Sequence, residues 1–181
     1  NQLVLMRRDG SSKQVLTSDR YDSRAPSFST DGKWLYFLSD RAFVATPGAP
    51  WGDRNMGPLF DKRTRIFALA LQAGNRFAFQ PVDELSAAKS DATPGKDKDA
   101  AGDKKSAKDA ADAPRLPAVD WDGLASRLFE VPLDAGNYSA LASDDKRLYF
   151  LDQPAGEDAS RLLSLAIDNK GDKRTDETTV V

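Results

Sequence analysis

Two residue types that carry much of enzyme chemistry are absent: the 181-residue chain has no histidine and no cysteine. Without imidazole, the Ser-His-Asp and Cys-His arrangements and nearly all catalytic zinc sites are excluded within this chain. Without thiols, disulfides and thiolate metal sites are excluded, and both reducing and oxidising compartments stay compatible with the sequence. Carboxylate, lysine or tyrosine chemistry stays open. We nevertheless assign no catalytic, cofactor-binding or metal-binding residue.

Long apolar runs and an excess of charge of one sign are also missing. No run approaches the roughly 18 apolar residues that a membrane-spanning helix needs. The 26 basic and 28 acidic residues leave a net charge of -2, which provides no electrostatic footprint for nucleic acid or an anionic membrane. We therefore expect neither as a partner. The chain begins at Asn1 without an initiator Met or a signal-peptide pattern, so we expect a piece of a longer protein.

The best-specified stretch that is present is Ala25 to Asp40, APSFSTDGKWLYFLSD. Its centre, Thr30-Asp31-Gly32, is typical of a hairpin turn, because Asp can accept hydrogen bonds from its own turn and Gly tolerates a positive φ. Strands are predicted at Pro26 to Ser29 and at Trp34 to Leu38. Alternate positions of the second strand are apolar on both faces, which predicts a strand that is covered on two sides.

The same pattern recurs later in the chain. Leu148 to Leu151 repeats the Leu-Tyr-Phe-Leu order of Leu35 to Leu38, and Tyr138 to Ala142 is matched with Ala25 to Ser29. The next predicted strand repeats too, since Arg161 to Ile167 (RLLSLAI) matches Arg65 to Leu71 (RIFALAL), although a short helix at the latter stays open. The copies lie too far apart for one propeller blade of about 40 to 50 residues unless long loops are set aside.

Two segments qualify as such loops. Arg41 to Lys62 is rich in Gly, Pro and Asn and is expected to be a long ordered loop. From about Asp83 to Pro114 the composition changes to Ala, Lys, Asp, Ser and Gly, which cannot bury enough apolar surface to offset the entropy of ordering. We interpret this insertion as a flexible, mixed-charge loop; a docking tail for a partner is the alternative.

These patterns predict an all-β fold, a partial β-propeller made of four-stranded antiparallel blades with a long disordered-like insertion. Residues 1–20 are expected to form the outer half of a preceding blade, with a hairpin of Leu3 to Met6 and Gln14 to Thr17. Residues 21–135 form a complete blade carrying the insertion at about 83–114, and residues 136–181 a nearly complete following blade. Within the complete blade, Ala118 to Val131 is expected to be a third hairpin. A β-sandwich is the alternative.

Few residues qualify as a functional site. The loop residues Trp51, Asp53, Arg54 and Asn55 form a possible contact surface for a peptide or a neighbouring domain; alternatively, Trp51 folds back to plug its blade. Asp144 and Asp145 have the composition of a calcium loop but are interpreted as turn residues. Asp122, before Gly123, is likewise assigned to a turn rather than to catalysis.

At this point a family resemblance can be stated. APSFSTDGKWLYFLSDRAF resembles the WD40-like repeat of TolB-type propellers, and the segments DRNMGPLFDKRTRIFALAL and VDWDGLASRLFEVPLDAGNY resemble the N-terminal propeller region of tricorn-type peptidases. The resemblance implies a large serine peptidase that degrades peptides, with propellers ahead of a PDZ-like module and a catalytic domain. The family's catalytic residues lie in those later domains, so no position here inherits their roles.

The resemblance implies partners as well: the remaining propeller, PDZ-like and protease domains of the same chain, and peptide substrates. A periplasmic or a cytoplasmic location in a prokaryote stays open. Because a partial propeller exposes strand edges, we also expect a homo-oligomer. The alternative function is a TolB-like or WD40-like interaction scaffold with no enzyme attached. A propeller enzyme acting on carbohydrate is disfavoured, since no convergent set of acidic residues can be identified.

Overall fold

The computed structural model describes residues 1–43, 60–80 and 116–168, and the backbone of residues 176–180. These ranges hold ten strands and one short 3-10 helix. In chain order they are β1 (Val4–Met6), β2 (Lys13–Val15), β3 (Ser23–Phe28), β4 (Trp34–Asp40), β5 (Thr64–Ala70), η1 (Leu124–Ser126), β6 (Leu128–Glu130), β7 (Tyr138–Ser143), β8 (Arg147–Asp152), β9 (Arg161–Ala166) and β10 (Asp176–Val180). In this part of the chain, no helix is long and apolar enough to cross a membrane.

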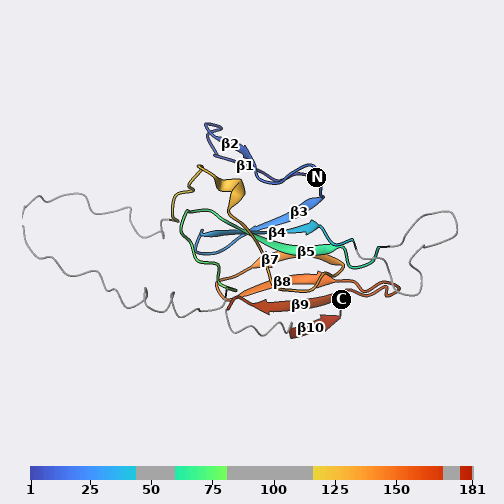
Figure 1. Ribbon diagram of the computed structural model, residues 1–181. Coiled ribbons are helices and arrows are strands. Elements are labelled where there is room, and N and C mark those ends of the chain that lie inside the picture. Colours follow the sequence, from blue (N-terminus) through green and yellow to red (C-terminus); the bar gives the residue numbers. More distant parts are fainter. Residues whose placement is uncertain (44–59, 81–115, 169–175, 181) are drawn as a thin grey trace, which may run out of the picture.

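Three antiparallel layers are stacked on one another (Figure 1). The β1-β2 hairpin is the first layer. The first sheet has the strand order β3-β4-β5-β6, and the second sheet has the order β10-β9-β8-β7. Successive four-stranded antiparallel sheets packed face to face are the architecture of propeller blades. The predicted fold class, an all-β partial propeller, is therefore confirmed.

β4 is one of the two central strands of the first sheet. It pairs with β5 over seven positions, from Trp34 opposite Ala70 to Asp40 opposite Thr64, so the helical alternative for this segment is wrong. Every residue from Trp34 to Ser39 is buried. Such two-sided burial requires a layer on each face.

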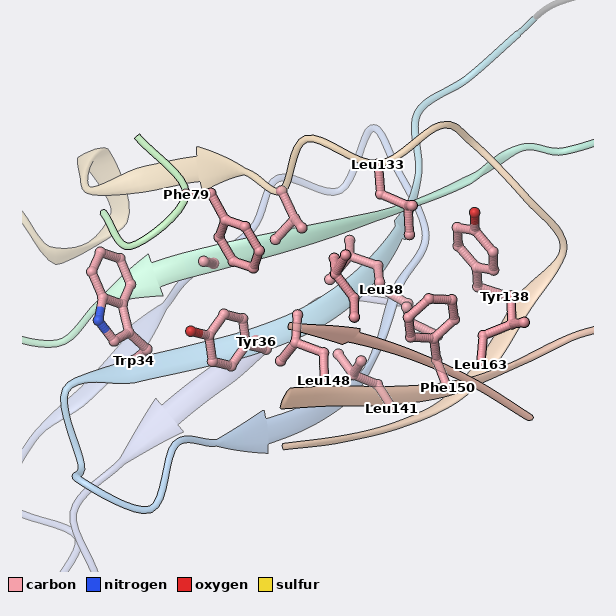
Figure 2. Packing of buried hydrophobic residues seen from close by; sticks show 14 of the residues in the cluster. Trp34, Tyr36, Leu38, Phe79, Leu133, Tyr138, Leu141, Leu148, Phe150 and Leu163 are labelled. Atoms are coloured by element: carbon pink, nitrogen blue, oxygen red, sulfur yellow. The ribbon is translucent and has the colours of Figure 1, made fainter. Parts of the chain in front are cut away.

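The two faces of the first sheet belong to separate apolar cores. The inter-sheet core lies against the second sheet and includes Trp34, Tyr36, Leu38, Ile66, Ala68, Leu141, Leu148, Phe150 and Leu163. Figure 2 shows Tyr36 and Leu38 of β4 facing Leu148 and Phe150 of β8. The hairpin-side core lies on the other face and consists of Leu16, Leu35, Phe37, Phe67, Leu69, Leu71 and Leu124, with Leu3 and Leu5 of the hairpin layer packed against it.

The repeat matches as predicted at the central strands but not at the first strand of each sheet. In both sheets this strand carries a bulge, at Ala25 with φ 51° and at Ala140 with φ 48°. The structural equivalent of Ala25 is thus Ala140, two positions later than the predicted match with Tyr138. The reason lies in the turns: Ser29 closes onto Trp34 and Asp144 onto Arg147, so the second turn is shorter and shifts the alignment.

The predicted third hairpin is wrong. Ala118 to Trp121 forms no strand, and Gly123, with φ 63°, leads into η1 instead of a β-turn between two strands. Only β6 joins the first sheet, opposite β5. The physical reason is Leu124, which is fully buried in the hairpin-side core from η1. A tight helical turn places this side chain inward, which a strand turn at the sheet edge would not do.

Candidate functional site

The predicted contact residues Trp51, Asp53, Arg54 and Asn55 lie outside the described residues, so that assignment stays a prediction. The loop of residues 44–59 and the insertion of residues 81–115 lie outside them as well. The candidate site must therefore be sought on the sheets themselves. The seam between the first and second sheets is the place where residues from distant parts of the sequence meet.

The edge strands β3 and β7 lie side by side along this seam. The Ser27 and Ser143 hydroxyls are 3.0 Å apart, and Ser143 also donates to the Phe28 carbonyl at 3.0 Å. These contacts cross between the sheets over short side chains. Small residues at these positions allow β3 and β7 to approach each other closely.

One end of the seam is closed by Arg24. Its guanidinium donates to Asp22 at 3.1 Å, to Asp40 at 2.9 Å and to Thr64 at 3.0 Å. Thr64 in turn donates to Asp40 at 2.7 Å, and Arg24 reaches the Tyr138 carbonyl of the second sheet at 3.4 Å. Because the charge of Arg24 is paired with carboxylates of the same cluster, we interpret this end of the seam as a structural contact between the two sheets rather than a binding site.

The opposite end of the seam opens into a cleft of about 240 Å³. The turn between β3 and β4 forms one wall and the turn between β7 and β8 forms the other. The cleft is lined by Ser29, Thr30, Asp31, Trp34, Tyr36, Ala78, Asp144, Asp145 and Ile167. Three of these residues carry carboxylates and none is basic, so the lining is acidic. Trp34 and Tyr36 contribute aromatic rings to the base of the cleft.

The carboxylate of Asp31 is fixed by its own turn. Its Oδ1 accepts hydrogen bonds from the Ser29 hydroxyl at 2.7 Å and from the Lys33 amide at 3.0 Å. Burial opposes ionisation, but these hydrogen bonds outweigh it and lower the pKa of Asp31. The ammonium of Lys33 lies 3.5 Å from Oδ2, with both side chains about half exposed, and such a surface pair contributes little. Asp31 is therefore an ionised, positioned acceptor.

Asp144 plays the same part in the second turn. Its Oδ1 accepts from the amides of Lys146 at 2.7 Å and Arg147 at 2.6 Å, and its Oδ2 accepts from the Tyr149 hydroxyl at 2.9 Å. The two backbone hydrogen bonds, followed by that of Tyr149, lower the pKa of Asp144. The predicted turn role of Asp144 is confirmed. Its neighbour Asp145 is exposed, and its carboxylate has no partner within the described ranges.

Trp34 and Tyr36 form the aromatic floor. Trp34 is held by Phe77 and Phe129, at ring-centroid distances of 5.6 Å and 5.7 Å. Tyr36 is 2% exposed and lines the cleft. Among the described residues, the buried side-chain polar atom without a hydrogen-bond partner is Arg127 Nε, not the Tyr36 hydroxyl. Burial, and then the charge of Asp31, raise the pKa of Tyr36 well above its usual range. Figure 2 shows this hydroxyl directed away from Leu148, toward the Trp34 end of β4.

The described residues that line the cleft have no arrangement for covalent catalysis. The Ser29 hydroxyl donates to Asp31 and accepts from the amides of Lys33 and Trp34, which is turn capping rather than nucleophile activation. Among the described residues, no group of three or more acidic side chains is arranged to hold a metal ion. Asp152, a nearby carboxylate at the end of β8, accepts from the Asn137 amide at 3.0 Å.

Sequence reasoning assigned Asp31, Asp144 and Asp145 to turns but did not bring them together. The missing step was to stack the repeat on itself, because equivalent turns of neighbouring blades lie at the same end of the stack. Asp122 differs from its predicted role in one detail: Asp120 Oδ1 accepts from the Asp122 amide at 3.2 Å, so Asp120 is the residue that caps this turn.

Comparison with known proteins gives a fold but no family. No protein-family model matches the chain, and no curated protein matches it in sequence. Among solved structures, the crystal structure of the tricorn protease is similar, with a TM-score of 0.64 and 17% sequence identity over 99% of this chain. The chain spans 15% of the length of that protein. This similarity shows a tricorn-like fold for the region.

Proposed function

We propose that this chain is a non-catalytic β-propeller segment of a tricorn-like serine peptidase, in which it guides peptide substrates or products and supports assembly. The observation that carries the proposal is the fold similarity to the tricorn protease, which extends over nearly the whole chain. The repeat of the Leu-Tyr-Phe-Leu strand and the resemblance of the sequence to TolB-type and WD40-like repeats support the same assignment. The propeller would act through binding, since function depends on sites rather than on the fold.

The blade boundaries belong to this proposal. The first sheet corresponds to a blade within residues 21–135, the second to a blade within residues 136–181, and the β1-β2 hairpin to the outer half of a preceding blade. The remaining propeller, a PDZ-like module and a protease domain would be its partners within one chain. Trp51, Asp53, Arg54 and Asn55 remain proposed as a contact surface for a peptide or a neighbouring domain.

The test uses the complete protein from which the chain derives. Its sequence after residue 181 is expected to contain a PDZ-like module and a serine-protease domain, and the purified protein is expected to hydrolyse unstructured peptides. Replacing the nucleophilic serine of the expected protease domain should abolish this activity. Substitutions on the propeller that keep its charge should instead alter the preference for peptide length. Absence of both domains, together with a stable co-purified protein partner, would overturn the proposal in favour of a scaffold without an enzyme.

A further inference from the structure

The guanidinium of Arg41 is held between aromatic rings at the end of the first sheet. Arg41 directly follows β4, and its Cζ atom lies 4.2 Å from the ring centroid of Phe67 and 5.2 Å from that of Tyr21. Its Nε donates to the hydroxyl of Ser39 at 3.1 Å. Stacking and this hydrogen bond fix the orientation of the planar group, so it is positioned before a ligand arrives.

The two terminal nitrogens of Arg41, Nη1 and Nη2, are open to a ligand. Within the described ranges, neither has a hydrogen-bond or ion-pair partner. The buried side-chain polar atom without a partner in these ranges is Arg127 Nε, so both terminal nitrogens of Arg41 reach solvent. A guanidinium binds a carboxylate through two parallel N–H donors. Because Ser39 engages Nε, the pair formed by Nη1 and Nη2 is the one left for such a fork.

Other partly buried arginines show what Arg41 lacks. Their carboxylate pairs are Arg24 with Asp40, Arg65 with Glu130, Arg127 with Asp120 and Arg161 with Glu157. Burial lowers the pKa of Arg41, and the charges of Tyr21 and Glu130 only partly oppose this. A partly desolvated cation without an ion pair in the described chain points to an anion supplied from outside it.

We propose that Arg41 binds a side-chain carboxylate of an acidic peptide through Nη1 and Nη2, and that Phe43 supports an apolar side chain next to that carboxylate. The inference deepens the proposed function and rests on it only for the claim that the ligand is a peptide. It adds the chemical class of peptide and the residues that recognise it.

The charges around Arg41 favour an acidic ligand. Lys62 and Arg63 are both exposed. The Arg63 carbonyl accepts from the amides of Arg41 and Ala42 at 3.1 Å and 3.0 Å, which holds this basic segment beside the end of β4. Basic residues from two segments thus lie together, and their summed potential attracts a carboxylate.

Phe43 gives the same surface an apolar part. Its side chain is 59% exposed, and its ring centroid lies 6.2 Å from those of Tyr21 and Phe60. The exposed ring therefore belongs to the aromatic cluster that holds Arg41. Arginine and aromatic side chains are enriched at the centres of interaction surfaces. The arginine selects the charge of the ligand, and the ring favours an apolar neighbour.

The test measures binding of small probes to the intact chain by NMR titration of its backbone amides at fixed ionic strength. Acetyl-leucyl-glutamate methylamide, whose one charge is the side-chain carboxylate, is expected to bind weakly and saturably and to shift the amides of Arg41, Ala42 and Phe43. Its glutamine analogue has the same shape without the charge and should bind at least about fivefold more weakly. Acetate, inorganic phosphate and acetyl-leucine test a free anion and a terminal carboxylate as the source.

Two variants separate the fork from net charge. Arg41→Lys keeps the charge but loses the planar pair of donors, so it should weaken the glutamate probe about three- to tenfold. The matched control is Arg63→Lys, the same change at an exposed neighbour, which should alter binding less than about twofold.

A third variant keeps the inference testable if Arg41→Lys disturbs the fold. Phe43→Ala removes an exposed ring, so stability should change little. This variant should lose the preference for acetyl-leucyl-glutamate methylamide over its alanyl-glutamate analogue, which the unchanged chain is expected to show.

Every other outcome overturns the inference. Equal binding of the glutamate and glutamine probes would do so, as would an unchanged affinity in a folded Arg41→Lys variant or no saturation up to about 50 mM. Acetate, phosphate or acetyl-leucine binding as tightly as the glutamate probe would replace the side-chain carboxylate with another ligand. Binding that is at least about fivefold tighter in Asp53→Asn would identify a carboxylate of the chain itself as the occupant. None of these results bears on peptidase activity of the complete protein, so failure of this site and failure of the proposed function are told apart.

Discussion

The two four-stranded sheets contain the same Leu-Tyr-Phe-Leu strand, yet among the described residues only the first sheet has a layer packed on each of its faces. Phe37 and Phe150 are equivalent, face the preceding layer and are both fully buried. Leu38 is also fully buried, against the second sheet, whereas its equivalent Leu151 is only half-buried. The same contrast separates Tyr36, buried, from Tyr149, half-buried. The motif therefore fixes which side chains face each way, and the neighbouring layer decides how deeply they are buried.

The largest expected effect concerns the face of each sheet that packs on the preceding layer. This face carries Phe37 in the first sheet and Phe150 in the second. Phe37→Ala and Phe150→Ala should each lower the free energy of unfolding by about 3–5 kcal/mol, because each leaves a cavity in a packed core. Urea denaturation of the intact chain, followed by circular dichroism, measures this. Phe28→Ala is the control, since Phe28 is 53% exposed and should cost much less. A loss below about 1 kcal/mol for Phe150→Ala would mean that the second sheet does not pack on the first.

The next effect is the difference between the sheets. Leu38→Ala should cost about 2–5 kcal/mol, as a change in a closed core. Leu151→Ala should cost about 1 kcal/mol, because a half-buried leucine gains only part of the transfer free energy of a buried one. The same denaturation experiment compares the two variants. Equal losses would show that the outer face of the second sheet is covered in solution, and sedimentation would then reveal whether a second copy covers it.

The fold was predictable where the local sequence pattern alone determines the turn or the strand and the neighbouring layers cover it as the pattern requires. The turn at Asp31-Gly32 and the two-faced strand at Leu35 to Leu38 predicted a layered all-β structure, and the inter-sheet and hairpin-side cores supply both covers. The prediction of a third hairpin was wrong because the burial of Leu124 depends on a core built from distant residues. The bulges at Ala25 and Ala140 were not predicted, for another reason. A positive φ is expected from sequence mainly at glycine, and alanine gives no such signal.

The cleft was only half predictable. Asp31 and Asp144 were recognisable as turn residues, and their hydrogen bonds confirm that role. Nothing local to Tyr36 signals that it lines a cleft, because its place in an alternating apolar strand is typical of a core residue. The site exists only once two copies of the repeat are stacked with their turns at one end.

A smaller effect should localise the alkaline pH dependence of stability. In the register of the sheets Tyr138 takes the place of Ser23, and the pKa of Tyr138 is raised to about 12 by burial and by Asp152 and Asp134, against 10.0 for a free tyrosine. A raised folded-state pKa gives stability that is complete below pH 10 and is lost as the pH rises toward 12, because the unfolded chain releases its proton first. We expect a loss of about 1–2 kcal/mol over this interval.

Tyr138→Phe checks this assignment. At pH 8 the variant should be about 1 kcal/mol less stable, because it lacks the hydrogen bond to Asp134. Between pH 10 and pH 12 its stability should fall less steeply than that of the unchanged chain, with a residual slope from Tyr36, whose pKa is also raised. Denaturation at several pH values measures both. An unchanged slope would assign the alkaline loss to other groups.

The smallest effect concerns the bulges, where the two sheets are alike. Ala25 and Ala140 have φ near 50°, and a left-handed conformation costs a residue with a Cβ about 1–2 kcal/mol. Glycine removes this strain but adds about 0.4–1 kcal/mol of unfolded-state entropy, so Ala25→Gly and Ala140→Gly should each stabilise by the difference, about 0–1.5 kcal/mol. Ala142→Gly, in the same strand without a positive φ, should destabilise by about 0.5–1 kcal/mol. Because Ala25 and Ala140 occupy equivalent bulge positions in β3 and β7, opposite signs for Ala25→Gly and Ala140→Gly would break the equivalence of the two sheets.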